Sequence, residues 1–425
     1  MAAEEKHPPG LYVLFFTEMW ERFSFYTVGA MWTLYVQNAG QGFGWPRERA
    51  TSTWANYLAF VYLSPLIGGW IADRKLGYRR SVMLGGLFFM AGYALLAVRS
   101  EPVMFAALAC LIIGNGFFKP NVSAMVGNLY PEGSHLKDRA YNIFYLGINV
   151  GAFLAPVVAE FMSRRFGYHP AFAIGALGML LSVGTLWRFQ RYVAQADRRP
   201  GDKPAPLAAA PSKQAIDQIP DRVRVGALIV IYVIVIVFWM VFHQNQTTLT
   251  YWANDNTAWN VTGVISNAIN PGWILFLTFP LVWFWGRLDR RGLEPSTPTK
   301  MAIGMCLTGL SFFIMYFAGK AGGDVGKVSP WWLIGAYGVL TLGELMLSPM
   351  GLSLVSKVAP LRLRGVMMGG WFLATAIGNK LTAIGVYWDR WPHSTFFAVL
   401  GSMALFMSLV LFLLLKPLKR AMPGV

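Results

Sequence analysis

The sequence predicts an all-α membrane protein with twelve transmembrane helices in two pseudo-symmetric bundles of six. Hydrophobic residues make up 55% of the 425-residue chain and charged residues only 13%. Apolar runs of helical length recur from end to end, as in polytopic membrane proteins. Basic residues gather in alternate loops, and features of the first half return in the second. These observations predict both the helical spans and their division into two halves.

Twelve apolar runs are long enough to cross a bilayer as helices. They cover residues 11–37, 51–73, 79–98, 102–129, 138–163, 170–194, 222–252, 262–286, 299–319, 330–358, 362–388 and 393–416. The segment between the sixth and seventh runs is rich in Ala, Pro, Arg and Asp, which is typical of a linker. It is too short for an extra pair of spans. We therefore expect an N-terminal bundle at 1–194, a cytoplasmic linker at 195–221 and a C-terminal bundle at 222–425.

The net charge of +16 indicates topology rather than a nucleic-acid partner. Lys and Arg concentrate in the loops on one side, such as residues 74–80, 287–300 and 416–420. This asymmetry predicts that both termini are cytoplasmic. We further expect the chain to lie in the plasma membrane, the inner membrane of a bacterium. Cys110 and Cys306 fall within apolar runs, so the sequence predicts no disulfide framework and no metal site.

The two halves resemble each other in their loops and in their helices. Asp73 and Arg74 begin a basic loop after the second run, and Asp289 and Arg290 begin one after the eighth. Three residues in and just after the fourth run recur 229 positions later, in and just after the tenth run. The pairs are Gly114 with Gly343, Pro120 with Pro349, and Pro131 with Pro360. Transporters are commonly built from such repeats, with the binding site near the midplane between them.

The first apolar run carries three charges. Glu18, Glu21 and Arg22 share one helical face with Tyr26, because residues three and four apart are neighbours on a helix. Each charge costs about 2.5–3.5 kcal/mol at the bilayer centre. Three together are tolerable only if they face a wet cavity or one another. The simpler alternative is a buried ion pair that only fixes helix packing.

Two further charges lie deep in the helices, and the repeat places them on opposite halves. Lys119 belongs to the fourth run, and Glu344 to the tenth, where it aligns with Asn115. We expect both to point into one cavity, where a cation and an anion suit a zwitterion a few ångströms long. The alternative, a direct salt bridge between them, is compatible, since a zwitterionic substrate can break it.

Several segments carry a family resemblance. The loop from Gly69 to Arg80 resembles the signature between the second and third helices of the major facilitator superfamily. Five segments together resemble the proton-dependent oligopeptide transporter family within it: Glu18 to Phe23, Phe117 to Ser123, Phe144 to Gly151, Gly343 to Pro349, and Gly370 to Leu373. The resemblance implies a transporter, not an enzyme, that imports di- and tripeptides by alternating access with an inward flow of protons.

The resemblance also implies roles for individual residues. Arg22 and Lys119 would bind the peptide carboxylate and Glu344 the amino group, while Glu18 and Glu21 would couple protons. The remaining residues implied to line the pocket are Tyr26, Tyr62, Asn149, Asn270 and Trp371. Asp73 and Arg74 are expected to gate the cytoplasmic helix ends, because a carboxylate beside arginines can lock them together. No cofactor other than protons is expected, and the partners are peptides and membrane lipid around a monomer.

The chain departs from the family pattern in two places. Phe25 stands where Tyr is usual, so one hydroxyl is missing. His243 stands where the seventh helix usually has an acid, and Gly29 stands where its arginine partner often lies. Losing both halves of that pair avoids an unpaired buried charge. His243 could then be a proton site of its own, since imidazole titrates near neutral pH, or a neutral side chain in a packed helix.

Other interpretations remain open at this point. A relative could carry nitrate or a dicarboxylate, although Glu344 favours a substrate with an amino group. A membrane-embedded enzyme would need a nucleophile and base or a metal site, and His243 has no Cys or Asp at a short spacing. A transporter-like receptor would not need the coupling acids. Lys380, in the eleventh run, has no evident partner and could extend toward the outer face.

Overall fold

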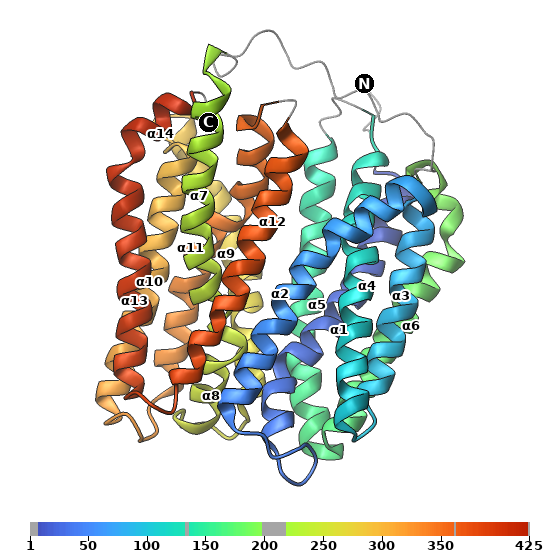
Figure 1. Cartoon of the computed structure of the whole chain (residues 1–425), viewed down its shortest axis with the longest axis vertical. Coiled ribbons are helices and arrows are strands. Elements are labelled where there is room, and N and C mark those ends of the chain that lie inside the picture. The colour runs from blue at the N-terminus through green and yellow to red at the C-terminus, as the bar shows by residue number, and fades with distance from the viewer. Residues whose placement is uncertain (1–6, 132–135, 198–217, 361–362, 424–425) are drawn as a thin grey trace. The chain divides into compact units, whose positions relative to one another are not determined.

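The computed structural model describes residues 7–131, 136–197, 218–360 and 363–423. They form helices, with one isolated bridge between Thr257 and Val328 (Figure 1). The predicted linker lies outside the described residues between 198 and 217. The α-helices are α1 (Pro9–Gln37), α2 (Arg47–Ile71), α3 (Tyr78–Leu96), α4 (Glu101–Asn128), α5 (Leu136–Phe166), α6 (Tyr168–Arg188), α7 (Asp221–Phe242), α8 (Thr248–Asp255), α9 (Ile269–Asp289), α10 (Thr297–Ala321), α11 (Pro330–Val358), α12 (Arg364–Leu381), α13 (His393–Leu413) and α14 (Leu415–Ala421).

Nine helical segments of the described chain are long and apolar enough to cross a membrane. Helix α1 is not among them, and it is the helix that carries Glu18, Glu21 and Arg22. All three of these side chains are buried. The charges that lower the hydropathy of α1 are therefore held inside the protein and not in lipid.

The chain forms two compact units. The first comprises residues 1–44 and 60–210, and the second comprises residues 45–59 and 211–425. The first turns of α2 thus belong with the second half of the sequence, whereas the rest of α2 belongs with the first half. Each unit is described separately below.

In the first unit, α1 is held by neighbours on two of its faces. A Cβ on Gly151 of α5 would lie 2.3 Å from the carbonyl oxygen of Met19, so only glycine allows this approach. On the side of α6, Ser24 donates a hydrogen bond to the carbonyl of Gly175 at 2.8 Å, and Ser182 donates one to the carbonyl of Thr17 at 2.6 Å. These contacts fix the rotation of α1 and thereby the direction of its charged face.

A close glycine contact joins α3 to α4 in the first unit and α10 to α11 in the second. Cβ atoms on Gly85 and Gly114 would each lie within 3.0 Å of the carbonyl oxygen of the other residue. Gly304 and Gly343 make the same mutual approach, at 2.7 and 2.6 Å. Gly114 and Gly343 are one of the pairs that the sequence repeat predicts. The two units therefore share a helix contact as well as a sequence pattern.

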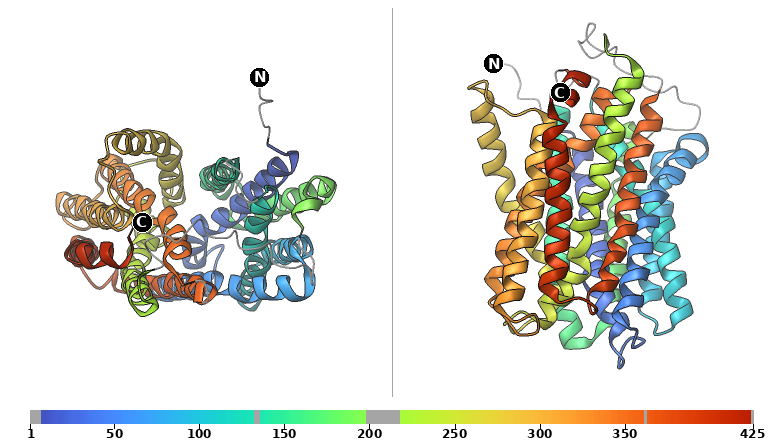
Figure 2. Two further views of the ribbon diagram at one scale, coloured as in Figure 1. Left: turned by 90° about the horizontal axis from the view of Figure 1, so that it is seen from above. Right: turned by 60° about the vertical axis from the view of Figure 1, so that its left-hand side comes forward.

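The second unit also contains a long helix pair, α10 and α13, which run side by side in Figure 1 and in the right-hand view of Figure 2. A Cβ on Gly309 of α10 would lie 2.9 Å from the carbonyl oxygen of Gly401 of α13. Ser408 of α13 donates a hydrogen bond to the carbonyl of Ala302 at 2.8 Å. Small residues thus allow the close packing that membrane helices need in place of a hydrophobic driving force.

The predicted span at 222–252 contains a break. Helix α7 ends at Phe242, residues His243–Gln246 form a 3₁₀ turn, and α8 begins at Thr248. The Gln244 side chain supports the break, since its amide donates to the carbonyls of Met240 and Thr382, both at 3.2 Å. Its side-chain oxygen accepts a hydrogen bond from Thr248 at 2.8 Å. Side chains therefore replace the backbone hydrogen bonds that the helix loses here.

Candidate functional site

Four charged side chains form a connected cluster inside the first unit. Arg22 donates two hydrogen bonds to the Glu21 carboxylate, one from Nε and one from Nη2, the latter at 2.6 Å. Lys119 of α4 donates to Oε1 of Glu18 at 2.5 Å. The same Glu18 oxygen lies 3.7 Å from Nε of Arg22. Both carboxylates of α1 therefore hold a cation, and Glu18 lies close to both cations.

The cluster is electrically balanced and nearly sealed from solvent. Two carboxylates face two cations. Glu18 and Glu21 are 0% exposed and Arg22 is 6% exposed, whereas the Lys119 side chain is 31% exposed. Within the described chain, Oε2 of Glu18 is buried without a hydrogen-bond partner. Lys119 is thus the most accessible member, and Glu18 keeps one oxygen that can accept a proton or a hydrogen bond.

Contacts on α1 and between α4 and α2 surround the two cations. The Arg22 guanidinium lies over the Phe25 ring, with its carbon 4.6 Å from the ring centre, at the position where the family pattern usually has Tyr. Helix α4 is fixed against α2 by Asn115, whose amide donates to the carbonyl of Val61 at 2.7 Å. Lys119 lies one helical turn after Asn115. These contacts hold both cations in place while their partner acids are charged.

The second unit contains one deep carboxylate with a different environment. Glu344 of α11 is 9% exposed, and its Oε2 accepts a hydrogen bond from the Asn270 amide at 2.8 Å. The same amide donates to Thr341 at 2.9 Å, and Thr341 donates to the carbonyl of Tyr337 at 2.7 Å. Among the described residues of its own unit, Glu344 forms no ion pair. In this described part of the unit, the Asn270 amide is its side-chain hydrogen-bond donor.

The remaining predicted pocket residues are placed as follows. Tyr26 and Tyr62 are half-buried, on α1 and α2. Asn149 is buried on α5 and donates to the carbonyl of Tyr145 at 2.9 Å. Trp371 of α12 is buried, its ring 6.2 Å from that of Tyr232 and pressed against Gly351, where a Cβ would clash at 1.8 Å. Their contact with a substrate stays a prediction.

The predicted gating residues lie where α2 ends. Asp73 and Arg74 belong to a π-helical turn at Ala72–Leu76 and are exposed. The Arg74 guanidinium carbon lies 4.7 Å from the Trp70 ring centre. The π turn places both charged side chains beyond the apolar part of α2.

His243 lies at the first residue of the break after α7 and is 5% exposed. Its ring stacks on Trp239 at 5.1 Å between ring centres, and the Asn379 side chain of α12 lies beside it. A Cβ on Gly378, the residue before Asn379, would lie 2.6 Å from the carbonyl oxygen of Ile236. Helix α12 therefore approaches α7 closely at the level of His243.

A second charged cluster, inside the second unit, was not predicted from the sequence. Arg47 at the start of α2 pairs with Asp255 of α8 and with Asp389, the latter at 3.1 Å. Next to it, Arg390 pairs with Glu48 at 2.9 Å. The sequence does show charged residues near the ends of these helices, but it does not reveal which helix ends lie close together.

Lys380 has a partner that the sequence did not reveal. Its ammonium donates to the side-chain oxygen of Asn56 on α2, and the contact is exposed. Asn56 lies in the part of α2 that belongs to the second unit. Spacing along the chain could not predict a contact between residues 324 positions apart.

Among the described residues, no group of three or more His, Cys, Asp or Glu side chains could hold a metal ion. Cys110 and Cys306 are free and half-buried on separate helices. The charged clusters are suited to binding charged groups and exchanging protons.

Comparison with known proteins agrees with this description. The POT family model matches residues 79–206 and 205–393. The chain is 31% identical to the di-/tripeptide transporter of Lactococcus lactis subsp. lactis (strain IL1403), covering 98% of this chain and 97% of that protein. It is 32% identical to the peptide transporter YePEPT of Yersinia enterocolitica subsp. palearctica serotype O:3 (strain YE-P4), with 98% and 95% covered.

The solved structures include a mutant of a peptide transporter POT in complex with alafosfalin. It superimposes with a TM-score of 0.89 at 31% identity, covering 98% of this chain and 96% of that one. The sequence match extends over nearly the whole length of both proteins, so it includes the helices that carry the charged clusters. The chain belongs to the POT family, whose members are transporters and not enzymes.

Proposed function

We propose that this protein is a proton-coupled symporter that imports di- and tripeptides by alternating access. The relatives named above are a di-/tripeptide transporter and a peptide transporter, and the deep charges suit a zwitterion. The observation that carries the proposal is the contrast between the units. The first unit pairs its deep cations with protonatable acids, and the second has a deep carboxylate with no cation beside it among the described residues of that unit.

In this proposal, the two ends of a peptide are bound by different units. Lys119 and Arg22 bind the carboxylate, and Glu344 binds the amino group. Asn270 keeps the Glu344 carboxylate oriented, since it donates to one oxygen and leaves the other for the ligand. Tyr26, Tyr62, Asn149 and Trp371 line the space for the peptide backbone and side chains.

Proton coupling follows from competition for the same cations. While Glu18 and Glu21 are charged, they occupy Lys119 and Arg22. A proton on either acid weakens that hold, and the released cation can bind the peptide carboxylate. The linkage is reciprocal, so a bound proton and a bound peptide strengthen each other's binding by the same factor.

His243 is a further candidate for proton coupling. It lies at a helix break, and the chain carries Gly29 and His243 where the family pattern has a cation and an acid. The test is the pH dependence of peptide uptake in His243→Gln, with the half-buried His169→Gln as the control. We expect the pH profile to shift only in the first variant. An unchanged profile would remove His243 from the mechanism.

The proposal includes the wider organisation of the chain. Twelve spans cross the inner membrane of a bacterium, both termini lie on the basic, cytoplasmic side, and a monomer works without any cofactor except protons. Asp73 and Arg74 lock the cytoplasmic helix ends until the halves rock. The two segments of the family match, 79–206 and 205–393, meet within the predicted linker.

The proposal can be tested with purified protein in proteoliposomes. Uptake of labelled dialanine is measured with and without an inwardly directed proton gradient. We expect accumulation above equilibrium only with the gradient, and its collapse when a protonophore is added. Equal accumulation with and without the proton gradient would contradict proton coupling. The absence of dialanine uptake under either condition would contradict the assignment of peptides as substrates.

A further inference from the structure

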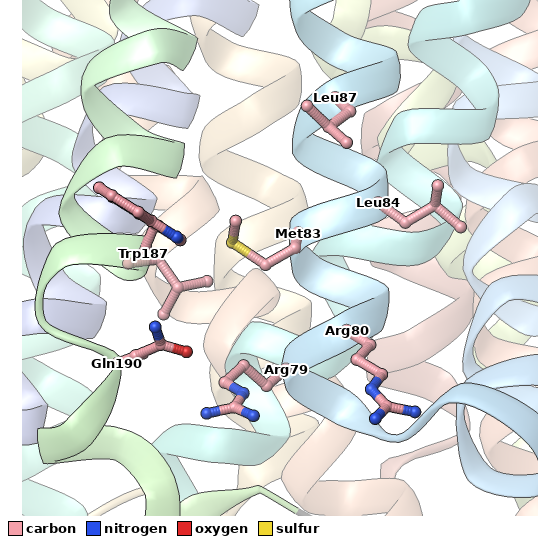
Figure 3. A pocket seen from close by; sticks show the side chains of 8 residues that line it. Arg79, Arg80, Met83, Leu84, Leu87, Trp187 and Gln190 are labelled. Atoms are coloured by element: carbon pink, nitrogen blue, oxygen red, sulfur yellow. The ribbon is translucent and has the colours of Figure 1, made fainter.

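A cavity of about 380 Å³ opens between α3 and α6 in the first unit, away from the charged cluster. One wall is the face of α3 that carries Arg79, Arg80, Met83, Leu84 and Leu87. The other wall comes from the end of α6 and the turn that follows: Leu186, Trp187 and Gln190. Figure 3 shows the two guanidinium groups at one end of the cavity and Met83 pointing from α3 toward Trp187.

The helix packing explains why the cavity exists. A Cβ on Gly86 would lie 2.4 Å from Cγ2 of Val183, so α3 and α6 are in close contact at this level. Nearer the basic end, larger side chains take the place of glycine on α3. The helices part there and leave a wedge. Its apolar walls are open to the surroundings, since Leu87 is 53% exposed and Trp187 is 64% exposed.

The charge at the mouth of the wedge is positive. Arg79 is partly neutralised by Asp197, which accepts a hydrogen bond from its backbone N–H at 2.9 Å and lies 3.7 Å from its Nε. Arg80 is exposed and forms no ion pair with any residue that the structure describes. Two arginines against one aspartate leave one positive charge, which matches the single negative charge of a phosphodiester.

The wedge therefore has two chemically distinct ends. One is cationic and lies at the start of α3, and the other is aliphatic and follows α3 into the apolar region. Trp187 lies at the boundary, where tryptophan is enriched in membrane proteins. A free anion would use only the first end, and a hydrocarbon only the second. Basic pockets between membrane helices are known to bind anionic lipid headgroups.

We infer that this wedge binds one anionic phospholipid from the leaflet on the basic side of the protein. Its phosphate is bound by Arg80, with Arg79 beside it, and the first part of an acyl chain lies along Met83, Leu84 and Leu87. The cavity volume lies within the range of small-molecule sites. It holds the phosphate and the upper chain, while the rest of the lipid stays in the bilayer.

The test is lipid binding to the purified, delipidated full-length protein, followed by native mass spectrometry. Phosphatidylglycerol is the anionic probe, and phosphatidylcholine is the probe without net charge. We expect one tightly bound phosphatidylglycerol per chain and no comparable phosphatidylcholine. Arg80→Gln should weaken phosphatidylglycerol binding by about tenfold. This variant removes no ion pair seen among the described residues, so it should fold.

Two further variants separate the charge from the cavity. Met83→Trp fills the wedge, keeps both arginines and should likewise weaken phosphatidylglycerol binding. Arg290→Gln with Arg291→Gln removes two arginines from the basic loop after α9 and should leave binding unchanged. Wild-type binding in both Arg80→Gln and Met83→Trp would overturn the inference, as would equal binding of phosphatidylcholine.

The position of the lipid can be checked by fluorescence. Phosphatidylglycerol with brominated acyl chains should quench the wild-type protein more than Trp187→Phe, because Trp187 lines the wedge. Inorganic phosphate and glycerol phosphate serve as competitors. If either displaces the lipid at equal concentration, the wedge is a phosphate site without a role for the acyl chain, and the inference fails.

Discussion

Helix α4 of the first unit and helix α11 of the second make matching contacts and carry opposite charges. In each, a glycine meets a glycine of the preceding helix, at Gly114 with Gly85 and at Gly343 with Gly304. After the glycine, α4 continues to Lys119, which is held by Glu18. On α11 the next residue is Glu344, which is held by an amide. The packing is repeated, and the charge is not.

In the proposed mechanism, this difference allows the chain to bind the two ends of a zwitterion with opposite charges. The first unit has its own counter-charges, so we propose that its cations become available when an acid is protonated. The second unit leaves its carboxylate without a cation among the described residues of that unit, so it can bind an amino group directly. Proton control would then reside in the first unit alone, unless His243 adds to it.

The largest effect should come from Lys119→Gln. This change removes the proposed ligand of the peptide carboxylate and leaves Glu18, which is 0% exposed, without its closest cation. Truncating one partner of a close charge pair costs about 2–5 kcal/mol of binding, so we expect dialanine uptake to fall by about a hundredfold. Uptake assays in proteoliposomes measure it, with the exposed Lys320→Gln as control. Wild-type uptake by Lys119→Gln would remove this residue from the site.

Glu21→Gln should separate coupling from transport. A glutamine can still accept a hydrogen bond from Arg22, but it cannot take up a proton. We expect proton-driven accumulation of peptide to disappear while counterflow exchange continues at a comparable rate. Both are measured on the same proteoliposomes. Uphill uptake retained in Glu21→Gln would contradict the assignment of proton control to this acid.

Substitution of the glycines in the two repeated contacts should have the smallest effect, and this effect is on the stability of the fold. Gly343→Ala would bring a Cβ within 2.6 Å of a carbonyl oxygen, and Gly114→Ala within 3.0 Å of one. Overpacking of this kind costs about 1–3 kcal/mol, so both variants should unfold at lower temperature, Gly343→Ala more so. Gly184→Ala and Gly335→Ala, which have open space at the Cβ, should be unaffected. A lower unfolding temperature in only one of Gly114→Ala and Gly343→Ala would contradict the view that the two units share this contact.

Much of this arrangement could be predicted from residue spacing. The charged face of α1 follows from helical periodicity, and the resemblance to the family assigned Lys119 and Glu344. The hydrogen-bond partners of these charged side chains could not be predicted in the same way. The contact of Lys119 with Glu18, and that of Asn270 with Glu344, depend on helix rotations that glycine and serine contacts set. Side-chain hydrogen bonds of Gln244 likewise support the break at His243, where hydropathy shows a continuous span.

We propose above all that Glu344 binds the amino group of the peptide. The most direct measurement compares dialanine with N-acetyl-dialanine as competitors for uptake, in the wild type and in Glu344→Gln. Glu160→Gln, a buried carboxylate of α5, is the matched control. We predict that the wild type and the control favour dialanine by about a hundredfold, since a buried charge pair contributes 2–5 kcal/mol, and that Glu344→Gln loses most of this preference. An unchanged preference in Glu344→Gln would contradict the account.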